Sequence, residues 1–330
     1  MRRIAAAALS VLLLAGCASE SARPLKVGMV LDTGGLGDRS FNDAAYAGLG
    51  RCVVRDNVDP TALQSTGTTD YAAELASLNG DDAIIAIGFM MQDALQKRAV
   101  ATPATRYAIV DAVVDAPNVT SITFREEEGS FLAGAIAGAT TKSRKVAFVG
   151  GIDSPVLRRF ESGFAAGAKQ AGRNVNVQVR YLGSFSDLDV GRRTADALYA
   201  GGVDIIFAAA GAGGIGVINE ARRRHKYAIG VDADQDGLAP GTVLTSVRKR
   251  IDVAVERICA DAAAHRPAGG HMTLGLAQDG VALTDFRYAR SIVPASALRA
   301  NDELRAAIIS GRLKVPSTRE DLARFTPIAL

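Results

Sequence analysis

Short apolar runs and amphipathic segments alternate along most of the chain. The apolar runs have the length of buried strands and lie at residues 27–31, 82–87, 106–110, 119–124, 146–149, 175–182, 203–207, 227–231 and 243–247. Segments between them carry apolar residues at helical spacing, for example 91–101, 127–139 and 155–171. Strands and helices in alternation predict an α/β fold with a parallel sheet covered by helices on both faces. Because the series starts again at Lys145, we expect two lobes of the same architecture.

Acidic and aromatic residues gather where these predicted strands end. The acids are Asp32, Asp111, Asp153, Asp232 and Asp234, and the rings near them are Phe41, Phe89 and Phe207. In an open parallel sheet the carboxyl ends of the strands border the ligand crevice. Aspartate is also common in turns and helix caps, so each acid alone says little. Their gathering with aromatic rings on one predicted edge favours a ligand-binding site.

The loop after the first strand is the first candidate wall of that site. It runs from Asp32 to Asn42, and Asp38 and Phe41 lie at the start of a predicted helix. Its glycines lack the dinucleotide-binding spacing and no lysine stands in the P-loop position, so a phosphate cradle is poorly supported. Ser40 can be an ordinary helix cap. A turn gains nothing from an aromatic ring, so we expect Phe41 to face a ligand.

The first 17 residues have the pattern of a secretory signal. Arg2 and Arg3 precede an apolar run that is too short to span a bilayer as a mature helix, and the run ends in Leu-Ala-Gly-Cys. We interpret residues 1–17 as a signal peptide with a bacterial lipobox, residues 18–25 as a polar tether, and Cys17 as the lipid-carrying residue. A plain signal peptide is the alternative. Lipid attachment predicts a protein at the extracytoplasmic face of the cell membrane.

Charge, cysteines and histidines narrow the function further. Without Arg2 and Arg3 the formal charge falls from +3 to +1, and no polybasic run remains, which argues against nucleic acid as a partner. Cys52 and Cys259 can form a disulfide outside the cytoplasm, although two buried free thiols fit as well. The histidines lack metal-ligand spacing, and neither a nucleophile elbow nor a usable His–Asp pair is present. We therefore predict a binding protein without metal, cofactor or catalytic residues.

Several short motifs match one known family in that family's order. They include Asp38-Arg-Ser-Phe-Asn42, Glu128-Gly-Ser-Phe-Leu-Ala-Gly134, Arg159-Phe-Glu-Ser-Gly-Phe164, Ile229-Gly-Val-Asp232 and Lys249-Arg-Ile-Asp-Val-Ala254. With these motifs behind a lipobox, the chain resembles the basic membrane protein family of bacterial lipoproteins, the substrate-binding group that includes a purine nucleoside receptor. The matching segments extend from residue 26 to about residue 255.

The resemblance implies a type I periplasmic-binding-protein fold. Two doubly wound, Rossmann-like lobes would be joined by three crossings and would close on a ligand at this hinge. We expect an N-terminal lobe of residues 26–124 and 245–281 and a C-terminal lobe of residues 125–244 and 282–330. The closing motion is expected near residues 124–127, 243–245 and 280–283.

The resemblance also implies seven ligand-binding residues. Phe41 and Phe207 look like the pair that sandwiches a purine base, and Asp111 looks like the acceptor for the N–H groups of that base. Asp232 and Lys249 look like the partners of the ribose hydroxyls, and Asp32 and Asn42 would complete the polar wall. Two aromatic rings suit the flat face of a base, and an acidic cleft would favour nucleosides over nucleotides.

We therefore expect a lipid-anchored protein that captures nucleosides, purine nucleosides above all, for the permease of an ABC importer. Two alternatives stay open. The same fold can bind another small polar ligand, such as a sugar or a signalling molecule. A nucleoside-hydrolysing surface lipoprotein is the other, since a cluster of acids can hold calcium and activate water.

Overall fold

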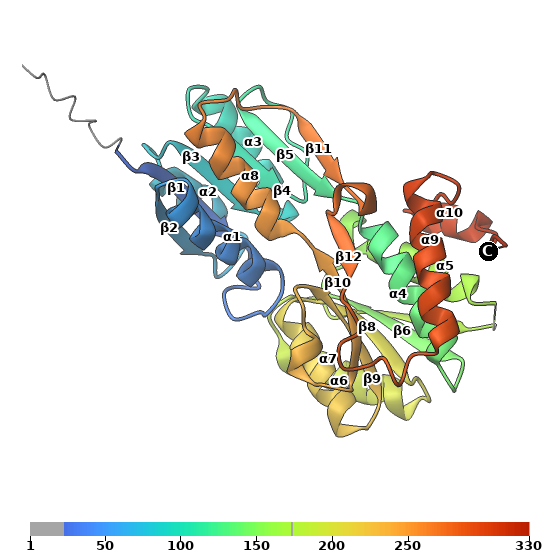
Figure 1. The fold of residues 1–330 in the computed structure, drawn as a ribbon. Helices are drawn as coiled ribbons and strands as arrows, with labels where there is room; N and C mark the ends of the chain where they lie inside the picture. Colours follow the sequence, from blue (N-terminus) through green and yellow to red (C-terminus); the bar gives the residue numbers. More distant parts are fainter. Residues whose placement is uncertain (1–22, 173, 330) are drawn as a thin grey trace, which may run out of the picture.

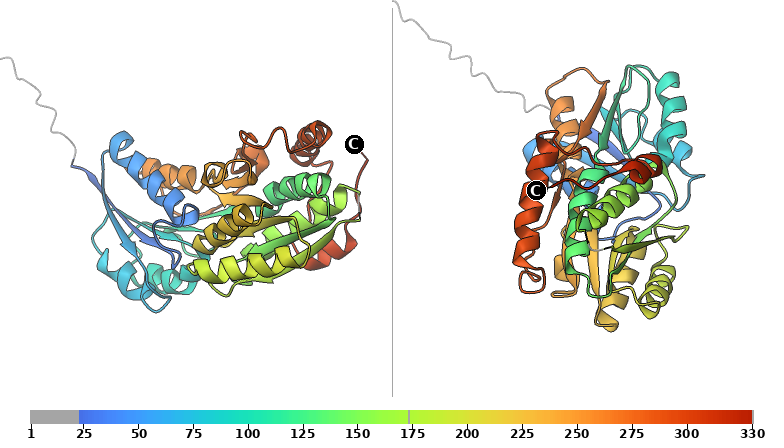
Figure 2. Two further views of the ribbon diagram at one scale, coloured as in Figure 1. Left: turned by 90° about the horizontal axis from the view of Figure 1, so that it is seen from below. Right: turned by 90° about the vertical axis from the view of Figure 1, so that its right-hand side faces the viewer.

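The computed structural model describes residues 23–172 and 174–329, which form two α/β lobes (Figure 1). The predicted signal peptide, Cys17 and the tether up to residue 22 lie outside the described residues. Each lobe contains a six-stranded sheet with helices on both faces, as the alternating pattern predicted (Figure 2). In the parts of the chain that the structure describes, no helix is both long enough and apolar enough to cross a membrane.

The N-terminal lobe has a parallel sheet with the strand order β11-β5-β4-β3-β1-β2. Its strands are β1 (Leu25–Leu31), β2 (Val58–Gln64), β3 (Ala83–Ile87), β4 (Tyr107–Val110), β5 (Val119–Phe124) and β11 (His271–Leu274). Its helices are α1 (Phe41–Arg55), α2 (Tyr71–Ser77), η1 (Phe89–Met91), α3 (Gln92–Ala101) and α8 (Ile251–Ala263). Residues of α1 and α8 pack on one face of the sheet, and residues of α2 and α3 pack on the other.

The C-terminal lobe repeats this arrangement with the strand order β12-β10-β9-β8-β6-β7. Its strands are β6 (Lys145–Gly150), β7 (Asn176–Tyr181), β8 (Ile205–Ala209), β9 (Tyr227–Asp232), β10 (Val243–Lys249) and β12 (Val281–Leu283), of which β12 runs antiparallel to β10. Its helices are α4 (Glu126–Thr140), α5 (Pro155–Gln170), α6 (Leu188–Ala200), α7 (Ala212–Arg223), η2 (Asp236–Leu238), α9 (Ala295–Ile309) and α10 (Arg319–Arg324). Helices α4 and α5 cover one face, and α6 and α7 cover the other.

Among the described residues, three segments connect the lobes. The chain passes from β5 into α4, from β10 into α8, and from β11 through η3 (Leu276–Gln278) into β12. The predicted boundary and hinge at residues 243–245 need correction, because β10 pairs with β9 from Val243 to Arg248 and so belongs to the C-terminal sheet. The second crossing therefore follows Lys249, which places this lysine at the hinge.

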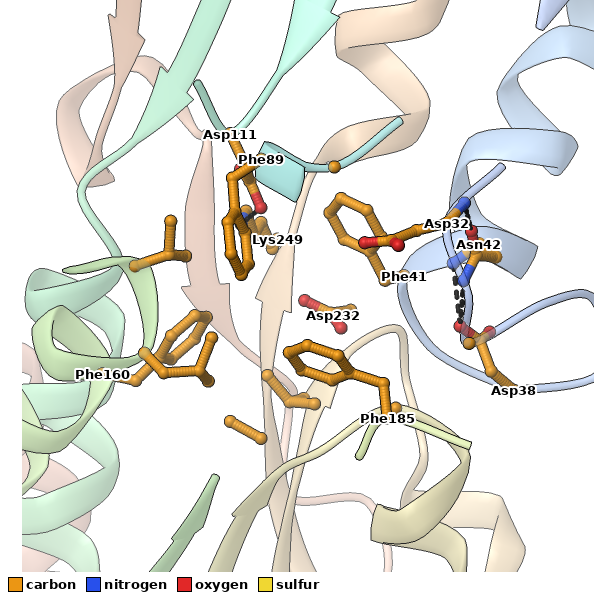
Figure 3. Close-up of a pocket in the computed structure, with 17 residues that line it drawn as sticks. Asp32, Asp38, Phe41, Asn42, Phe89, Asp111, Phe160, Phe185, Asp232 and Lys249 are labelled. Carbon is orange, nitrogen blue, oxygen red and sulfur yellow. Dashed lines mark hydrogen bonds and ion pairs between the residues drawn. The ribbon is translucent and has the colours of Figure 1, made fainter. Parts of the chain in front are cut away.

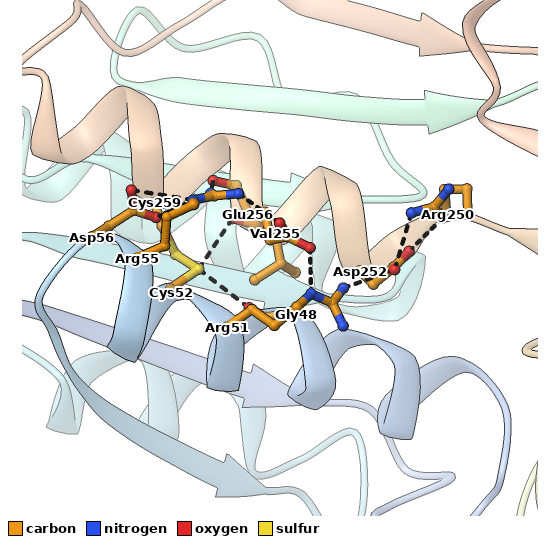
Figure 4. Close-up of polar contacts among 10 residues, drawn as sticks. All are labelled: Gly48, Arg51, Cys52, Arg55, Asp56, Arg250, Asp252, Val255, Glu256 and Cys259. Atoms are coloured by element: carbon orange, nitrogen blue, oxygen red, sulfur yellow. Dashed lines mark hydrogen bonds and ion pairs between the residues drawn. A yellow bond between two sulfur atoms is a disulfide. The ribbon is translucent and has the colours of Figure 1, made fainter.

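Helices α1 and α8 are joined covalently. Cys52 of α1 and Cys259 of α8 form a disulfide, with their Cα atoms 6.2 Å apart (Figure 4). On the surface beside it, Arg51 pairs with Asp252 at 2.7 Å and with Glu256 at 2.6 Å. The disulfide thus links two segments that are far apart in the chain, and both segments lead directly from the cleft: α1 begins at Phe41 and α8 follows Lys249.

Candidate functional site

A cavity with about 530 Å³ of empty space lies between the lobes, where the carboxyl ends of both sheets face each other (Figure 3). Segments that follow β1, β3 and β4 line it from the N-terminal lobe. Segments at the ends of β8, β9 and β10, the start of α5 and the loop before α6 line it from the C-terminal lobe. This is the edge at which the sequence predicted a ligand site.

Six of the seven predicted ligand-binding residues line this cavity. They are Asp32, Phe41, Asn42, Asp111, Asp232 and Lys249. The first four come from the N-terminal lobe and the last two from the ends of β9 and β10, so each lobe contributes to one shared wall.

Phe207 does not reach the cavity, which corrects the predicted sandwich. Its side chain is fully buried in the C-terminal lobe, with its ring 5.4 Å from that of Phe164 and 5.6 Å from that of Phe148. Phe207 is the third of the five residues of β8, so its side chain points to the face that α5 covers rather than past the strand end. Asp153 and Asp234 also lie outside the cavity lining, and Asp153 pairs with Arg158 on the surface.

Three other aromatic rings line the cavity in place of Phe207. They are Phe89 of η1, Phe160 of α5 and Phe185 of the loop between β7 and α6. Phe185 enters from the C-terminal lobe and meets Phe89 edge to face, with ring centroids 6.5 Å apart. Figure 3 shows Phe41 and Phe185 on opposite sides of Asp232. Phe185 was not predicted, because its loop has no periodic pattern that would mark it.

The start of α1 is capped by Asp38 rather than by Ser40. The Asp38 carboxylate accepts the backbone N–H groups of Ser40 at 2.8 Å and Asn42 at 2.9 Å, and also the Asn42 side-chain amide at 3.0 Å. A carboxylate at a helix N-terminus satisfies N–H groups that have no partner within the helix. The Ser40 hydroxyl is therefore not needed as a cap, and it donates instead to Asp232 of the other lobe at 2.5 Å.

Asp32 is fixed by contacts on two sides. Its Oδ1 accepts the Tyr71 hydroxyl at 2.5 Å, and its backbone N–H donates to Asn42 Oδ1 at 2.9 Å. Gly88 packs against this carboxylate with a φ of 119°, and a Cβ at that position would overlap it. Asp32 and Asn42 are therefore held rigidly in the cavity wall.

Lys249 and Asp111 join the lobes at the back of the cavity. The Lys249 ammonium donates to Asp111 Oδ2 at 2.6 Å, whereas Asp111 Oδ1 is buried and has no hydrogen-bond partner among the described residues. Asp111 and Asp232 both have the left-handed backbone conformation, with φ of 72° and 62°. Backbone strain of this kind is concentrated at functional sites. Asp111 thus lies in the cavity lining, and its Oδ1 can accept a further hydrogen bond.

The cavity is strongly acidic. Four aspartates line it, and Lys249 is the single lysine or arginine among its described lining residues. Burial raises the pKa of Asp232 to about 7, with Asp38 and Asp111 adding to the effect, while Lys249 and the Ser40 hydroxyl oppose it. Burial alone would lower the pKa of Lys249, but the charges of Asp111, Glu126 and Asp232 raise it above its ordinary value. Lys249 therefore remains an ammonium group.

The carboxylates and aromatic rings of the cavity suit an organic ligand that carries hydrogen-bond donors. Within residues 23–172 and 174–329, no group of three or more His, Cys, Asp or Glu side chains is arranged to hold a metal ion. Aromatic faces can pack on a flat ring, and carboxylates accept N–H and O–H groups. Phosphate would be repelled by the excess of negative charge.

Comparisons with known proteins agree with this geometry. The family model of PnrA-like ABC transporter substrate-binding proteins, Bmp, matches residues 25–319. A CD4+ T-cell-stimulating antigen of Listeria monocytogenes is 37% identical over 90% of this chain and 89% of its own length. The ABC transporter nucleoside-binding protein BmpA of Lactococcus lactis is 35% identical over 93% of this chain and 96% of its own length.

A solved structure supports the same assignment. The solute-binding protein of an ABC transporter system from Aeropyrum pernix K1 superposes with a TM-score of 0.85 at 29% identity, covering 91% of this chain and 96% of its own. The two lobes thus have the type I periplasmic-binding-protein fold. The chain belongs to the Bmp family of ABC transporter substrate-binding proteins, a non-catalytic family whose members take up a small ligand for a transporter.

Proposed function

We propose that this protein captures nucleosides, with purine nucleosides preferred, and passes them to the permease of an ABC importer. The observation that carries the proposal is the pairing of aromatic rings from both lobes with an acidic rim in one cavity between the lobes. Phe41 and Phe185 are the rings we assign to the two faces of the base, in place of the predicted pair with Phe207. The name of the related nucleoside-binding protein of Lactococcus lactis supports the same ligand class.

The polar residues divide between base and sugar in this proposal. Asp111 Oδ1, buried and without a partner among the described residues, would accept an N–H group of the base. Asp232 and Lys249 would bind the ribose hydroxyls, and Asp32 and Asn42 would complete the wall. A nucleotide would bring a phosphate against four aspartates, so the nucleoside should bind more tightly than its phosphate ester.

Attachment to the membrane through Cys17 completes the proposal. It is supported by the Leu-Ala-Gly-Cys ending of the apolar run and by the polar segment that follows it. Arg23 forms an ion pair with Asp82 at 2.7 Å, so the described chain begins against the N-terminal lobe. A tether of this length would keep the receptor close to its permease.

Isothermal calorimetry on the full chain in mild detergent tests the ligand class. The panel contains adenosine, guanosine, inosine, cytidine, adenosine monophosphate and free ribose. We expect the purine nucleosides to bind most tightly, the monophosphate more weakly, and ribose not to bind. Heat from ribose alone, or no heat from any nucleoside, would overturn the proposal. Unchanged inosine after incubation excludes hydrolysis.

A further inference from the structure

A chain of four alternating charges leads from the cavity into the hinge. Asp111 contacts Lys249 at 2.6 Å, Lys249 contacts Glu126 at 3.0 Å, and Glu126 contacts Arg159 at 2.5 Å. The Glu126 side chain is fully buried and the Lys249 side chain is 2% exposed. Asp111 and Lys249 line the cavity, whereas Glu126 and Arg159 lie behind it. Glu126 and Arg159 therefore do not belong to the lining of the ligand site.

These charges sit on the segments that connect the lobes. Glu126 is the first residue of α4 and follows the first crossing, and Lys249 is the last residue of β10 and precedes the second. Backbone hydrogen bonds from Arg125 to Leu274 and from Arg250 to Gly280, both 2.9 Å, tie these crossings to the third. The ion pair between Glu126 and Lys249 thus joins two of the three connections at the hinge.

Glu126 provides a second negative charge next to the buried Lys249 ammonium, in addition to that of Asp111. A buried ammonium group needs compensating charge, and removal of one partner from a buried pair is strongly unfavourable. Phe41, Phe124 and Phe160 surround the Lys249 ammonium at 5.0–5.6 Å from their ring centroids. Arg159 in turn compensates Glu126, whose pKa burial would raise but Lys249 and Arg159 bring below its ordinary value. Two cations and two carboxylates balance along this chain.

We infer that Glu126 and Arg159 are positioning residues for Lys249, and that they couple recognition of the ligand's hydroxyl groups to the geometry of the hinge. The hydroxyl part of this inference rests on the proposed nucleoside function. Neither residue touches the ligand in this scheme. Glu126 fixes the ammonium from behind, so that the ammonium keeps one direction open toward the cavity, and Arg159 keeps Glu126 ionised.

The test compares Glu126→Gln with a matched control on the same helix pair. Arg158→Gln removes an ion pair with Asp153 that is similarly short, at 2.7 Å, but lies on the surface. The double variant Glu126→Gln/Arg159→Gln leaves no uncompensated charge and serves if the single variant does not fold. All are measured as the full chain in mild detergent, with inosine and 2′,3′-dideoxyinosine as probes.

We expect Glu126→Gln, or the double variant, to weaken inosine binding by about tenfold or more and dideoxyinosine binding much less. The ratio of the affinity for inosine to the affinity for dideoxyinosine then falls toward one, whereas Arg158→Gln keeps the wild-type ratio. A purely structural role would weaken both ligands by the same factor, and that result would overturn the inference.

A second readout does not depend on any ligand. In protein whose lysines are labelled with carbon-13 at Cε, nuclear magnetic resonance follows the titration of Lys249. Loss of the Glu126 charge should lower the Lys249 pKa, and the Arg158 control should not move it. If the wild type binds no nucleoside, the proposed function fails while this titration still decides the inference. An unshifted Lys249 titration in Glu126→Gln would overturn it.

Discussion

Phe185 and Phe207 differ in what a substitution at each should change. Phe185 lines the cavity, and Phe207 is fully buried among other rings of the C-terminal lobe. If a base stacks between Phe41 and Phe185, alanine at either position should weaken nucleoside binding by about 5- to 150-fold, since stacking contributes about 1–3 kcal/mol per base. Phe207→Leu should instead cost about 1–2 kcal/mol of unfolding free energy and leave affinity nearly unchanged.

Calorimetry and chemical denaturation on the same three variants separate these effects. A loss of affinity in Phe207→Leu as large as that in Phe185→Ala would contradict the assignment of Phe185 to the site. Equal binding by wild type and Phe41→Ala would contradict stacking altogether.

Glu127 is a buried acid outside the ligand site whose charge should oppose folding. It is 6% exposed, and its Oε2 has no hydrogen-bond partner among the described residues. Burial raises its pKa to about 7 from an ordinary value of 4.5. The folded protein thus binds this proton more tightly than the unfolded chain, and the unfolding free energy rises as the pH falls through 7.

Glu127→Gln should remove this pH dependence. We expect the variant to be the more stable form at pH 8, and its advantage should shrink by about 1 kcal/mol between pH 8 and pH 6. Urea denaturation at both pH values measures the change. Glu303→Gln, at an exposed position on α9, is the control. Its unfolding free energy should change between the two pH values as that of the wild type does. A constant difference between wild type and Glu127→Gln would contradict the prediction.

At the scale of single residues, the sequence predicts well which residue types gather at the site. It predicts less well which side chain makes each contact there. Six of the seven predicted ligand-binding residues reach the cavity: Asp32, Asp111, Asp232 and Lys249 lie at or just after strand ends, and Phe41 and Asn42 lie at the start of α1. The role of Lys249 was expected from the family resemblance. Phe207 fails because position within β8, not proximity to its end, decides which face a side chain takes. Ser40 was considered as an ordinary cap, but the Asp38 carboxylate takes this role by accepting two backbone N–H groups of the same turn.

Helices α4 and α5 pack so closely that glycine is required at their contact. A Cβ at Gly167 would overlap the carbonyl oxygen of Phe131, and one at Gly134 would overlap that of Phe164. Gly167→Ala should therefore destabilise the fold by about 1–3 kcal/mol, because the backbones cannot approach as before. Helix α4 begins at Glu126 and α5 carries Arg159. The close packing of the two helices therefore also fixes how far apart these two charged residues lie.

Gly50 provides the matched control on α1. It is exposed, lies inside the helix and has open space where a Cβ would be. Gly50→Ala should stabilise the protein by about 0.5–1 kcal/mol through helix propensity alone. Denaturation curves that shifted in the same direction for both alanine variants would contradict the close-packing argument.

At the scale of elements, apolar periodicity finds the buried strands and the edge strand β7, but it misses the edge strand β2. Strand β3 is buried at all five positions and was predicted from its apolar run. Strand β2 lies at the edge of its sheet, contains Asp59 and Pro60, and has one buried residue, so no apolar pattern marks it. The disulfide pairing was left open for a different reason, because only the fold brings Cys52 and Cys259 together.

At the scale of the whole molecule, the two lobes are held in a closed arrangement by contacts that opening would break. The Ser40 hydroxyl donates to Asp232 at 2.5 Å, and the Gln235 side-chain amide donates to the Arg39 carbonyl at 2.9 Å. Each bond joins a residue of the N-terminal lobe to one of the C-terminal lobe. Figures 1 and 2 show the two lobes next to each other, with the chain passing between them.

Ser40→Ala should shift the balance between open and closed forms without altering the closed form itself. Its hydrogen bond to Asp232 exists only when the lobes are together, and at pH 8 Asp232 is mainly ionised, so its loss should cost closure about 1 kcal/mol. The ligand concentration for half-maximal compaction in small-angle scattering should then rise about fivefold, while the compact form at saturation stays the same. Ser310→Ala removes a hydroxyl that bonds within the C-terminal lobe at the end of α9, away from the cavity lining, and should leave both quantities unchanged. Half-maximal compaction of Ser40→Ala at the wild-type concentration would mean that this bond does not help to close the cleft.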